Sequence, residues 1–242
     1  MHTKISSLLI IAGFVAILML AGSGPLYRLH IVDLGQAFTV MRWAAYLGAA
    51  VVVLSVVYMI WKRPRGLLLG LMMLGTIAAL ISFYLPYSQL QTARSVPPIH
   101  DITTNTSNPP EFVAIAPLRA DAPNPVAYPG EETAEQQRQA YPDIETYTTS
   151  AEPATVFDAA LVVASDMGWQ LVASDSEAGR IEATATTTWF GFKDDVVIRI
   201  QQENGQTQVD VRSKSRVGRS DVGANAERIR TFISKLDQRL KL

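Results

Sequence analysis

The stretch from Lys193 to Arg216, KDDVVIRIQQENGQTQVDVRSKSR, decides the fold of the C-terminal half of this chain. Asn204-Gly205 lies between two segments that suit β-strands, and this dipeptide is the strongest short signal for a tight hairpin turn. With that pair at the centre of the turn, the predicted partners are Ile198 with Val211, Ile200 with Val209, Arg199 with Asp210, Asp195 with Lys214 and Val197 with Arg212. One face of the hairpin is then apolar and the other carries opposite charges, so turn and pairing predict the same register.

The residues around this hairpin predict an α+β domain. Pro153–Met167 has the apolar spacing of an amphipathic helix, with Ser150 or Thr149 as its N-cap and Gly168 just after its C-terminus. Further predicted elements are strands over Trp169–Ala173 and Arg180–Trp189 and a closing helix over Asp221–Leu240. The expected fold is an antiparallel β-meander flanked by two helices that cover one face of the sheet.

The N-terminal part of the chain has the composition of a membrane anchor. Three apolar segments, about 5–22, 42–61 and 66–86, have the length of roughly 20 residues that a spanning helix needs. We therefore predict three transmembrane helices within residues 1–95. None of the three segments carries an ionisable residue in its interior, so we expect an anchor rather than an ion or proton pathway.

Charge predicts the orientation of this anchor. The connection Lys62-Arg63-Pro64-Arg65 places three cations between the second and third spans, and short basic loops stay on the cytoplasmic side. The N-terminus then lies inside and the part after the third span lies outside. Alternatively, the first span is a cleaved signal peptide with small residues at Ala21-Gly-Ser-Gly24, and the C-terminal part faces outward in that case too.

Residues 96–150 connect the anchor to the expected core of the soluble domain, residues 151–242. Nine prolines occur between Val96 and Pro142, and each removes a backbone donor and disfavours helix at the preceding residue. Apolar residues between them are more frequent than in a flexible linker. We therefore predict an extended strap packed on the domain, with Phe112–Leu118 as a candidate edge strand and Glu131–Ala140 as a short helix.

Basic residues gather where the hairpin ends and the closing helix begins. A helix N-terminus, flexible glycines and guanidinium groups together favour an anion. The candidate anion-binding residues are Arg212, Arg216, Gly218, Arg219 and Gly223. In the alternative, a structural joint, these cations are paired internally and Asp221 or Ser220 caps the helix. The candidate pairing and capping residues are Asp194, Asp195, Asp210, Asp221 and Asn225. The anion site requires accessible Arg216 and Arg219 with at least one unpaired guanidinium.

Other chemistries have less support. The chain has no cysteine, which excludes disulfides and thiol catalysis, and neither a metal nor a cofactor is expected. A hydrolase or transferase site would combine His100-Asp101 with Asp194 and Asp195, and it requires His100 within hydrogen-bond reach of a carboxylate. The adjacent Asp194 and Asp195 point to opposite faces of a strand, which disfavours a catalytic pair. After residue 96 the chain has fourteen Lys and Arg against twenty-one Asp and Glu, which disfavours nucleic acid as a partner.

Several motifs resemble a bacterial family known as domain of unknown function 1499. Similar segments are Gly191-Phe-Lys-Asp-Asp195 and the pattern Ser-Arg-x-Gly-x-x-Asp-x-Gly-x-Asn over residues 215–225. Pro97-Pro-Ile-His-Asp-Ile-Thr103 and Asn108-Pro-Pro-Glu-Phe112 resemble the opening of its membrane-anchored proteobacterial members. Many members open with Ser-Pro-Asn-Cys instead, and no role of that thiol can be carried over. The resemblance covers roughly Val96 to Leu242 and implies a folding unit but no activity.

Together these features predict a multi-pass protein of the bacterial inner membrane with its C-terminal domain on the periplasmic side. We expect a binding or assembly module for envelope components or anionic groups. Its expected partners are the lipid bilayer and either an anionic lipid or an envelope protein. An envelope hydrolase or transferase is the alternative.

Overall fold

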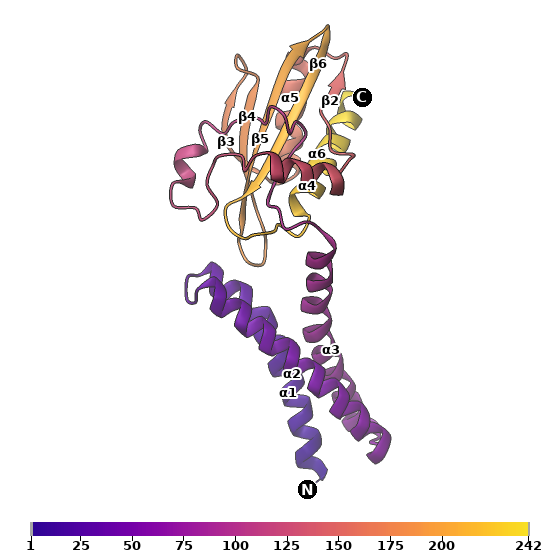
Figure 1. Ribbon diagram of the computed structural model, residues 1–242. Helices are drawn as coiled ribbons and strands as arrows, with labels where there is room; N and C mark the ends of the chain where they lie inside the picture. Colours follow the sequence, from indigo (N-terminus) through magenta and orange to yellow (C-terminus); the bar gives the residue numbers. More distant parts are fainter. Residues whose placement is uncertain (1, 242) are drawn as a thin grey trace. The chain divides into compact units, whose positions relative to one another are not determined.

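The structure of the chain, a computed structural model that describes residues 2–241, divides into two compact units. The first unit contains the chain up to Thr92 together with the short segment Thr188–Gly191, and the second contains the remainder. Three long helices form the first unit, and a sheet with helices forms the second (Figure 1). The predicted fold class, three apolar N-terminal helices followed by an α+β domain, is confirmed.

The helices of the first unit are longer than the apolar segments alone predict. They are α1 (His2–Arg28), α2 (Leu34–Lys62) and α3 (Gly66–Ser95), and all three are long and apolar enough to cross a membrane. α2 starts well before its apolar segment because Asp33 and Gln36 form a capping box. The Asp33 carboxylate accepts from the Gln36 N–H at 2.8 Å, and the Asp33 N–H donates to Gln36 Oε1 at 3.0 Å. α3 continues through Pro86 to Ser95 instead of ending near that proline.

Small residues allow these helices to approach closely. A Cβ atom added to Gly13 of α1 would lie 2.2 Å from the carbonyl oxygen of Gly75 in α3. A Cβ atom added to Gly48 of α2 would lie 2.4 Å from the carbonyl oxygen of Ala79 in α3. Both separations are too short for a real side chain, so glycine is required at Gly13 and Gly48. Close backbone contact of this kind holds helices together where burial of apolar side chains gives little driving force.

We expect Gly13→Ala to destabilise the packing of α1 on α3 by about 1–3 kcal/mol, because its methyl group overlaps the Gly75 carbonyl. The measurement is the temperature at which the detergent-solubilised full chain loses its monodisperse peak in size-exclusion chromatography. Gly22→Ala is the matched control in the same helix, since a Cβ atom there meets nothing within 4 Å. Equal melting of the two variants would contradict the close contact.

The second unit is built on a six-stranded antiparallel sheet in the order β1-β6-β5-β4-β3, with β2 also pairing with β6. Its elements are β1 (Asp101–Thr103), the 3₁₀ helix η1 (Ala116–Arg119), α4 (Glu131–Ala140), β2 (Tyr147–Thr149), α5 (Pro153–Asp166), β3 (Gln170–Asp175), β4 (Arg180–Thr186), β5 (Lys193–Glu203), β6 (Gln206–Ser215) and α6 (Ala224–Leu240). The long β5–β6 hairpin has the predicted register, with Ile198 facing Val211 and Arg199 facing Asp210. The three-residue strands β1 and β2 were not predicted, because they are too short to show a period.

One face of the sheet packs against both α5 and α6 and forms the main apolar core. Core residues from the strands are Ile181, Val196, Ile198, Ile200, Val209 and Val211, and those from the helices include Val156, Phe157, Ile229, Phe232 and Leu236. Trp169 stacks on Phe232 with 5.4 Å between the ring centroids. The predicted helix with Gly168 behind it is present, and Gly168 has φ +71°.

The predicted N-cap of α5 is wrong. Glu152 occupies the cap position and its side chain makes no capping bond, while Thr149 Oγ1 accepts from the Ala151 N–H at 3.3 Å. The helix begins at Pro153, a residue suited to the first helical position, so the cap position falls on Glu152 and not on Thr149 or Ser150.

Part of the strap lies on the opposite face of the sheet. Phe112 and Ile115 form a small apolar cluster with Val197 of β5, and Val126 packs against it. The Glu131–Ala140 helix is present as α4, and its Gln137 side chain bonds both the N–H and the carbonyl of Thr103 at 3.0 and 2.6 Å.

The candidate edge strand Phe112–Leu118 does not form. The buried carboxylate of Glu182 on β4 accepts the backbone N–H groups of Val113, Ala114 and Ile115 at 2.8–3.1 Å. The chain then turns into η1. Three successive N–H groups that converge on one carboxylate cannot alternate in direction as a strand requires. A buried acid therefore decides the conformation of this segment.

Candidate functional site

Six charged side chains meet between the sheet and the strap. They are Asp101 of β1, Asp195 of β5, Arg119 of η1, Arg212 and Lys214 of β6, and Arg216 just after that strand, and we call them the buried charge cluster. Alternation along β6 explains the placement: Arg212 and Lys214 point away from the apolar core, toward the strap. The basic residues that the sequence places at the end of the hairpin therefore lie largely inside the protein.

Asp101 binds two of the buried cations. The guanidinium of Arg212 donates to both of its carboxylate oxygens at 2.9 Å, and Lys214 Nζ donates to Oδ2 at 2.7 Å. The side chains of all three residues are almost completely buried. The expected pairing of Lys214 with Asp195 is thus a register pair only, because the ammonium group turns to Asp101.

Asp195 binds the other two cations. Arg216 donates to its two oxygens at 2.8 and 2.9 Å, and Arg119 of the strap donates to Oδ2 at 2.6 Å. Thr184 Oγ1 adds a bond to Oδ1 at 2.7 Å. Charge-assisted bonds of this kind are the strong ones in proteins, and here two arginines share one carboxylate.

The strap carbonyls complete the coordination of the cations. Arg212 donates to the carbonyls of Pro110 and Val126 at 3.1 and 3.0 Å, and Lys214 donates to that of Ala127 at 2.7 Å. A proline-rich segment has few N–H groups and little regular structure, so its carbonyls need donors from elsewhere. The cations of β6 supply these donors, and the face of Arg212 is covered by the aromatic rings of Phe112 and Tyr128.

Burial has clear electrostatic consequences in this cluster. Loss of hydration lowers the pKa of Lys214, and the nearby Asp101 carboxylate opposes that shift. Burial also lowers the pKa of Arg119, against the effect of its bond to Asp195. Burial raises the pKa of the Tyr128 hydroxyl to about 12, and Asp101 adds to the rise. Arg212 and Lys214 are therefore committed to internal partners and are out of reach of an external anion.

The remaining predicted pairing residues also have partners. Asp194 points to the helix side and binds Arg228 of α6 at 2.6 Å, and Asp210 binds Arg199 at 2.7 Å. Asn225 bonds Ser213 Oγ and Ser215 Oγ at 2.7 and 3.0 Å and the carbonyl of His100 at 3.1 Å. These residues tie β6, α6 and the start of β1 together.

The N-terminus of α6 is occupied by a carboxylate of the chain itself. Asp221 accepts from the N–H groups of Gly223 and Asn225 at 2.8 and 2.9 Å. Gly223 is the N-cap residue, with φ +83°, and it has no side chain to offer. Burial raises the pKa of Asp221, while the two N–H bonds oppose the rise. The helix end that the sequence offers to an external anion is thus already filled.

One part of the region between β6 and α6 stays open, the loop of residues 217–220, which we call the Arg219 loop. Within the described part of the chain, Arg219 makes no ion pair, and the N–H groups of residues 217–220 have no protein partner. The loop is fixed through its carbonyls: Asn124 Nδ2 donates to the Gly218 carbonyl at 3.0 Å, and His100 Nδ1 lies 3.3 Å from the Arg219 carbonyl. Gly218 is exposed with φ +103°, a conformation that favours glycine.

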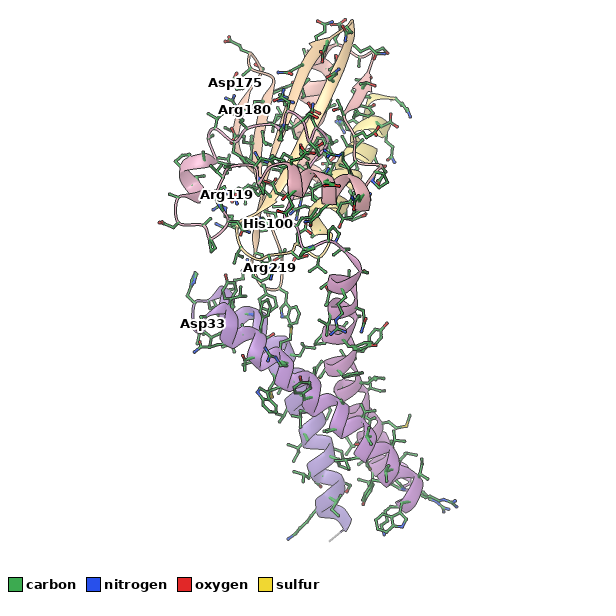
Figure 2. The ribbon with its side chains drawn as sticks, in the orientation of Figure 1. Asp33, His100, Arg119, Asp175, Arg180 and Arg219 are labelled. Atoms are coloured by element: carbon green, nitrogen blue, oxygen red, sulfur yellow. The ribbon has the colours of Figure 1, made fainter. Side chains whose placement is uncertain are left out.

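Figure 2 shows His100 and Arg219 at the same end of the second unit. Among residues 2–241, His100 makes no bond to a carboxylate side chain, so the arrangement required for the hydrolase alternative is not formed. Over the same residues, no group of three or more His, Asp or Glu side chains is placed as a metal site. The pKa of His100 is lowered, mainly by burial.

We expect His100 to make the second unit less stable in mild acid. The unfolded side chain takes up a proton near its ordinary pKa of 6.5, whereas the folded one resists protonation because its pKa is lower. The unfolded state thus binds more protons as the pH falls below 6.5, and the free energy of unfolding decreases there. Urea titrations of the full chain in micelles should show that His100→Gln loses part of this pH dependence. The exposed His30 is the control, and an unchanged profile in His100→Gln would contradict the assignment.

Two central residues were not predicted, Arg119 and Glu182. Arg119 is one of two basic residues between Val96 and Ala178, and an isolated arginine in an acidic, proline-rich strap is a usable signal for a buried partner. Glu182 lies on the polar face of its strand, where the sequence offers no sign that a strap covers it. Glu182 binds backbone N–H groups of the strap, and no pattern of residues near it in the sequence predicts that contact.

Comparison with known proteins places the second unit in a protein family. Residues 101–236 match the model of a family described as "Protein of unknown function (DUF1499)". A search of curated proteins found no match. The matched range begins at β1 and ends within α6, so it contains the buried charge cluster and the Arg219 loop.

Proposed function

Since the chain belongs to the family described as "Protein of unknown function (DUF1499)", which assigns no activity, we propose a function from the site alone. The protein is a membrane-anchored binding module, and the Arg219 loop binds anionic groups at the membrane surface. The observation that carries this proposal is the exposed Arg219 beside backbone N–H groups that have no protein partner among residues 2–241. Successive N–H groups next to a guanidinium form a concave donor set for a phosphate or carboxylate.

The position of the loop along the chain supports this role. The Asp221 N–H donates to the carbonyl of Ile99 at 3.1 Å, only a few residues after the end of α3 at Ser95. A Cβ atom added to Gly223 would lie 3.7 Å from Val96, the first residue after that helix. The chain itself therefore keeps the loop close to the end of a helix that is able to span a membrane. The head groups of anionic lipids are the ligands offered at such a place.

The proposal includes the orientation. The protein lies in the bacterial inner membrane with its C-terminal unit on the periplasmic side, because the basic connection at residues 62–65 is retained in the cytoplasm. A reporter enzyme that is active only outside the cytoplasm, fused after Leu242, should be active. An inactive reporter would show that the C-terminal unit lies in the cytoplasm and would contradict this orientation.

Lipid binding is tested on the full chain in nanodiscs of phosphatidylcholine with or without phosphatidylglycerol. Backbone amides of the Arg219 loop should exchange their hydrogens more slowly when the anionic lipid is present. A basic residue near an anionic surface contributes about 1 kcal/mol to membrane binding. In Arg219→Ala, the slowing of exchange that the anionic lipid causes should therefore be about fivefold smaller.

Arg239→Ala is the matched control, because Arg239 is an exposed arginine near the other end of α6 and should leave the loop unaffected. Exchange that is the same in both lipid mixtures, or equal losses in the Arg219 and Arg239 variants, would overturn the proposal. Arg216→Ala is unsuitable for this test, because it also breaks the pair with Asp195.

A further inference from the structure

Helix α1 contains a carbonyl without its ordinary helical partner. Pro25 lies inside α1, and proline has no N–H to donate to the carbonyl of the residue four positions earlier, Ala21. Trp189, in the segment Thr188–Gly191 that belongs to the helical unit, supplies the missing donor. Its indole Nε1 donates to the Ala21 carbonyl at 3.2 Å.

The same turn of α1 has room for the indole ring. A Cβ atom added to Gly24 would lie 2.5 Å from Cδ1 and 2.7 Å from Nε1 of Trp189, so any side chain at Gly24 would displace the ring. Gly24 and Pro25 therefore act together. Gly24 leaves space for the indole ring, and Pro25 leaves the Ala21 carbonyl free to accept its N–H. We call this place on the helix the Gly24–Pro25 notch.

Neighbouring contacts hold the segment on both sides of the tryptophan. Arg28 Nη1 at the end of α1 donates to the Thr188 carbonyl at 2.9 Å. The Phe190 ring is nearly buried, with ring centroids 6.2 Å from Tyr27 of α1 and 5.5 Å from Phe38 of α2. A hydrogen bond, an arginine contact and an aromatic cluster thus act on one short segment.

From this geometry we infer that the Gly24–Pro25 notch is a receptor for Trp189, and that α1 stays in the mature protein as a docking helix. The notch overlaps Ala21-Gly-Ser-Gly24, the small residues at which a signal peptidase would cut. Docking of Trp189 gives these small residues a structural reason of their own. Cleavage of the first span as a signal peptide would remove both the Ala21 carbonyl that accepts the bond and the space beside Gly24 that holds the ring.

The hydrogen bond is tested with a double-mutant cycle on the full chain in nanodiscs. Trp189→Phe keeps an aromatic ring but removes the donor, and it should speed hydrogen exchange of the amides at residues 188–191 by about fivefold. Pro25→Ala restores an N–H that can bond to the Ala21 carbonyl within the helix. In that background Trp189→Phe should have a clearly smaller effect, since the carbonyl no longer lacks a partner.

The space is tested with Gly24→Leu, which should speed exchange of the same amides at least as much as Trp189→Phe. Gly22→Leu is the control in the same helix, because a Cβ atom added there meets nothing within 4 Å. The inference fails if Gly24→Leu and Gly22→Leu behave alike, or if the effect of Trp189→Phe is the same in both backgrounds. It also fails if the intact mass of the protein purified from membranes shows that the residues before Pro25 have been removed.

Discussion

Asp101→Ala should lower the free energy of unfolding of the C-terminal unit by about 3–5 kcal/mol, at the upper end of what single substitutions cause. The reason is that Asp101 is the shared partner of Arg212 and Lys214, two cations that are almost completely buried. Removing one carboxylate leaves both charges in a place from which water is largely excluded. The strap carbonyls that remain are neutral and offset only part of this cost.

Urea titration of the full chain in micelles, followed through the fluorescence of Trp169 stacked on Phe232, measures this loss. Asp166→Ala on the exposed side of α5 is the control and should be within about 0.5 kcal/mol of the unmodified chain. Lys214→Met should be less harmful than Asp101→Ala, because Asp101 keeps both bonds from Arg212. A loss below about 1 kcal/mol for Asp101→Ala would show that these charges reach water in solution.

Asp195→Ala is expected to cause the second largest loss, again about 3–5 kcal/mol. This substitution removes the carboxylate from Arg119, which is fully buried, and from Arg216, which is partly exposed. Because Arg119 lies in η1, we expect the strap to loosen as well as the sheet. Limited proteolysis between residues 104 and 128 should therefore become faster in this variant.

Asp195→Asn separates the effect of the side chain's shape on stability from the effect of its negative charge. The amide fills the same volume but offers one acceptor oxygen and no negative charge, so its stability should lie between those of the aspartate and alanine forms. Asp121→Ala, an exposed acid in the same strap, is the matched control for proteolysis. Unchanged cleavage in Asp195→Ala would mean that Arg119 does not hold the strap.

Local patterns in the sequence predicted much of the fold. The Asn204-Gly205 turn, together with alternating residues on both sides, specifies the hairpin register, because a slip of one residue would turn every apolar side chain to the wrong face. The amphipathic helices α5 and α6 and the three long apolar helices follow from equally local signals. β1 and β2 were missed because three residues carry no period, and the strand at Phe112–Leu118 was wrong because Glu182 takes its backbone donors.

By itself the sequence determined the three apolar helices, the hairpin register and the concentration of cations at the end of β6, because each depends on residues close together in the chain. Only the tertiary structure decided what those cations do. Arg212 and Lys214 bind Asp101 and the strap carbonyls, which lie about a hundred residues away along the chain. Arg216 shares Asp195 with Arg119 of the strap. Backbone carbonyls and N–H groups are the same at every residue, so a sequence cannot show which of them a strap will present to a buried charge. Among residues 2–241, Arg219 is left exposed and without an ion pair.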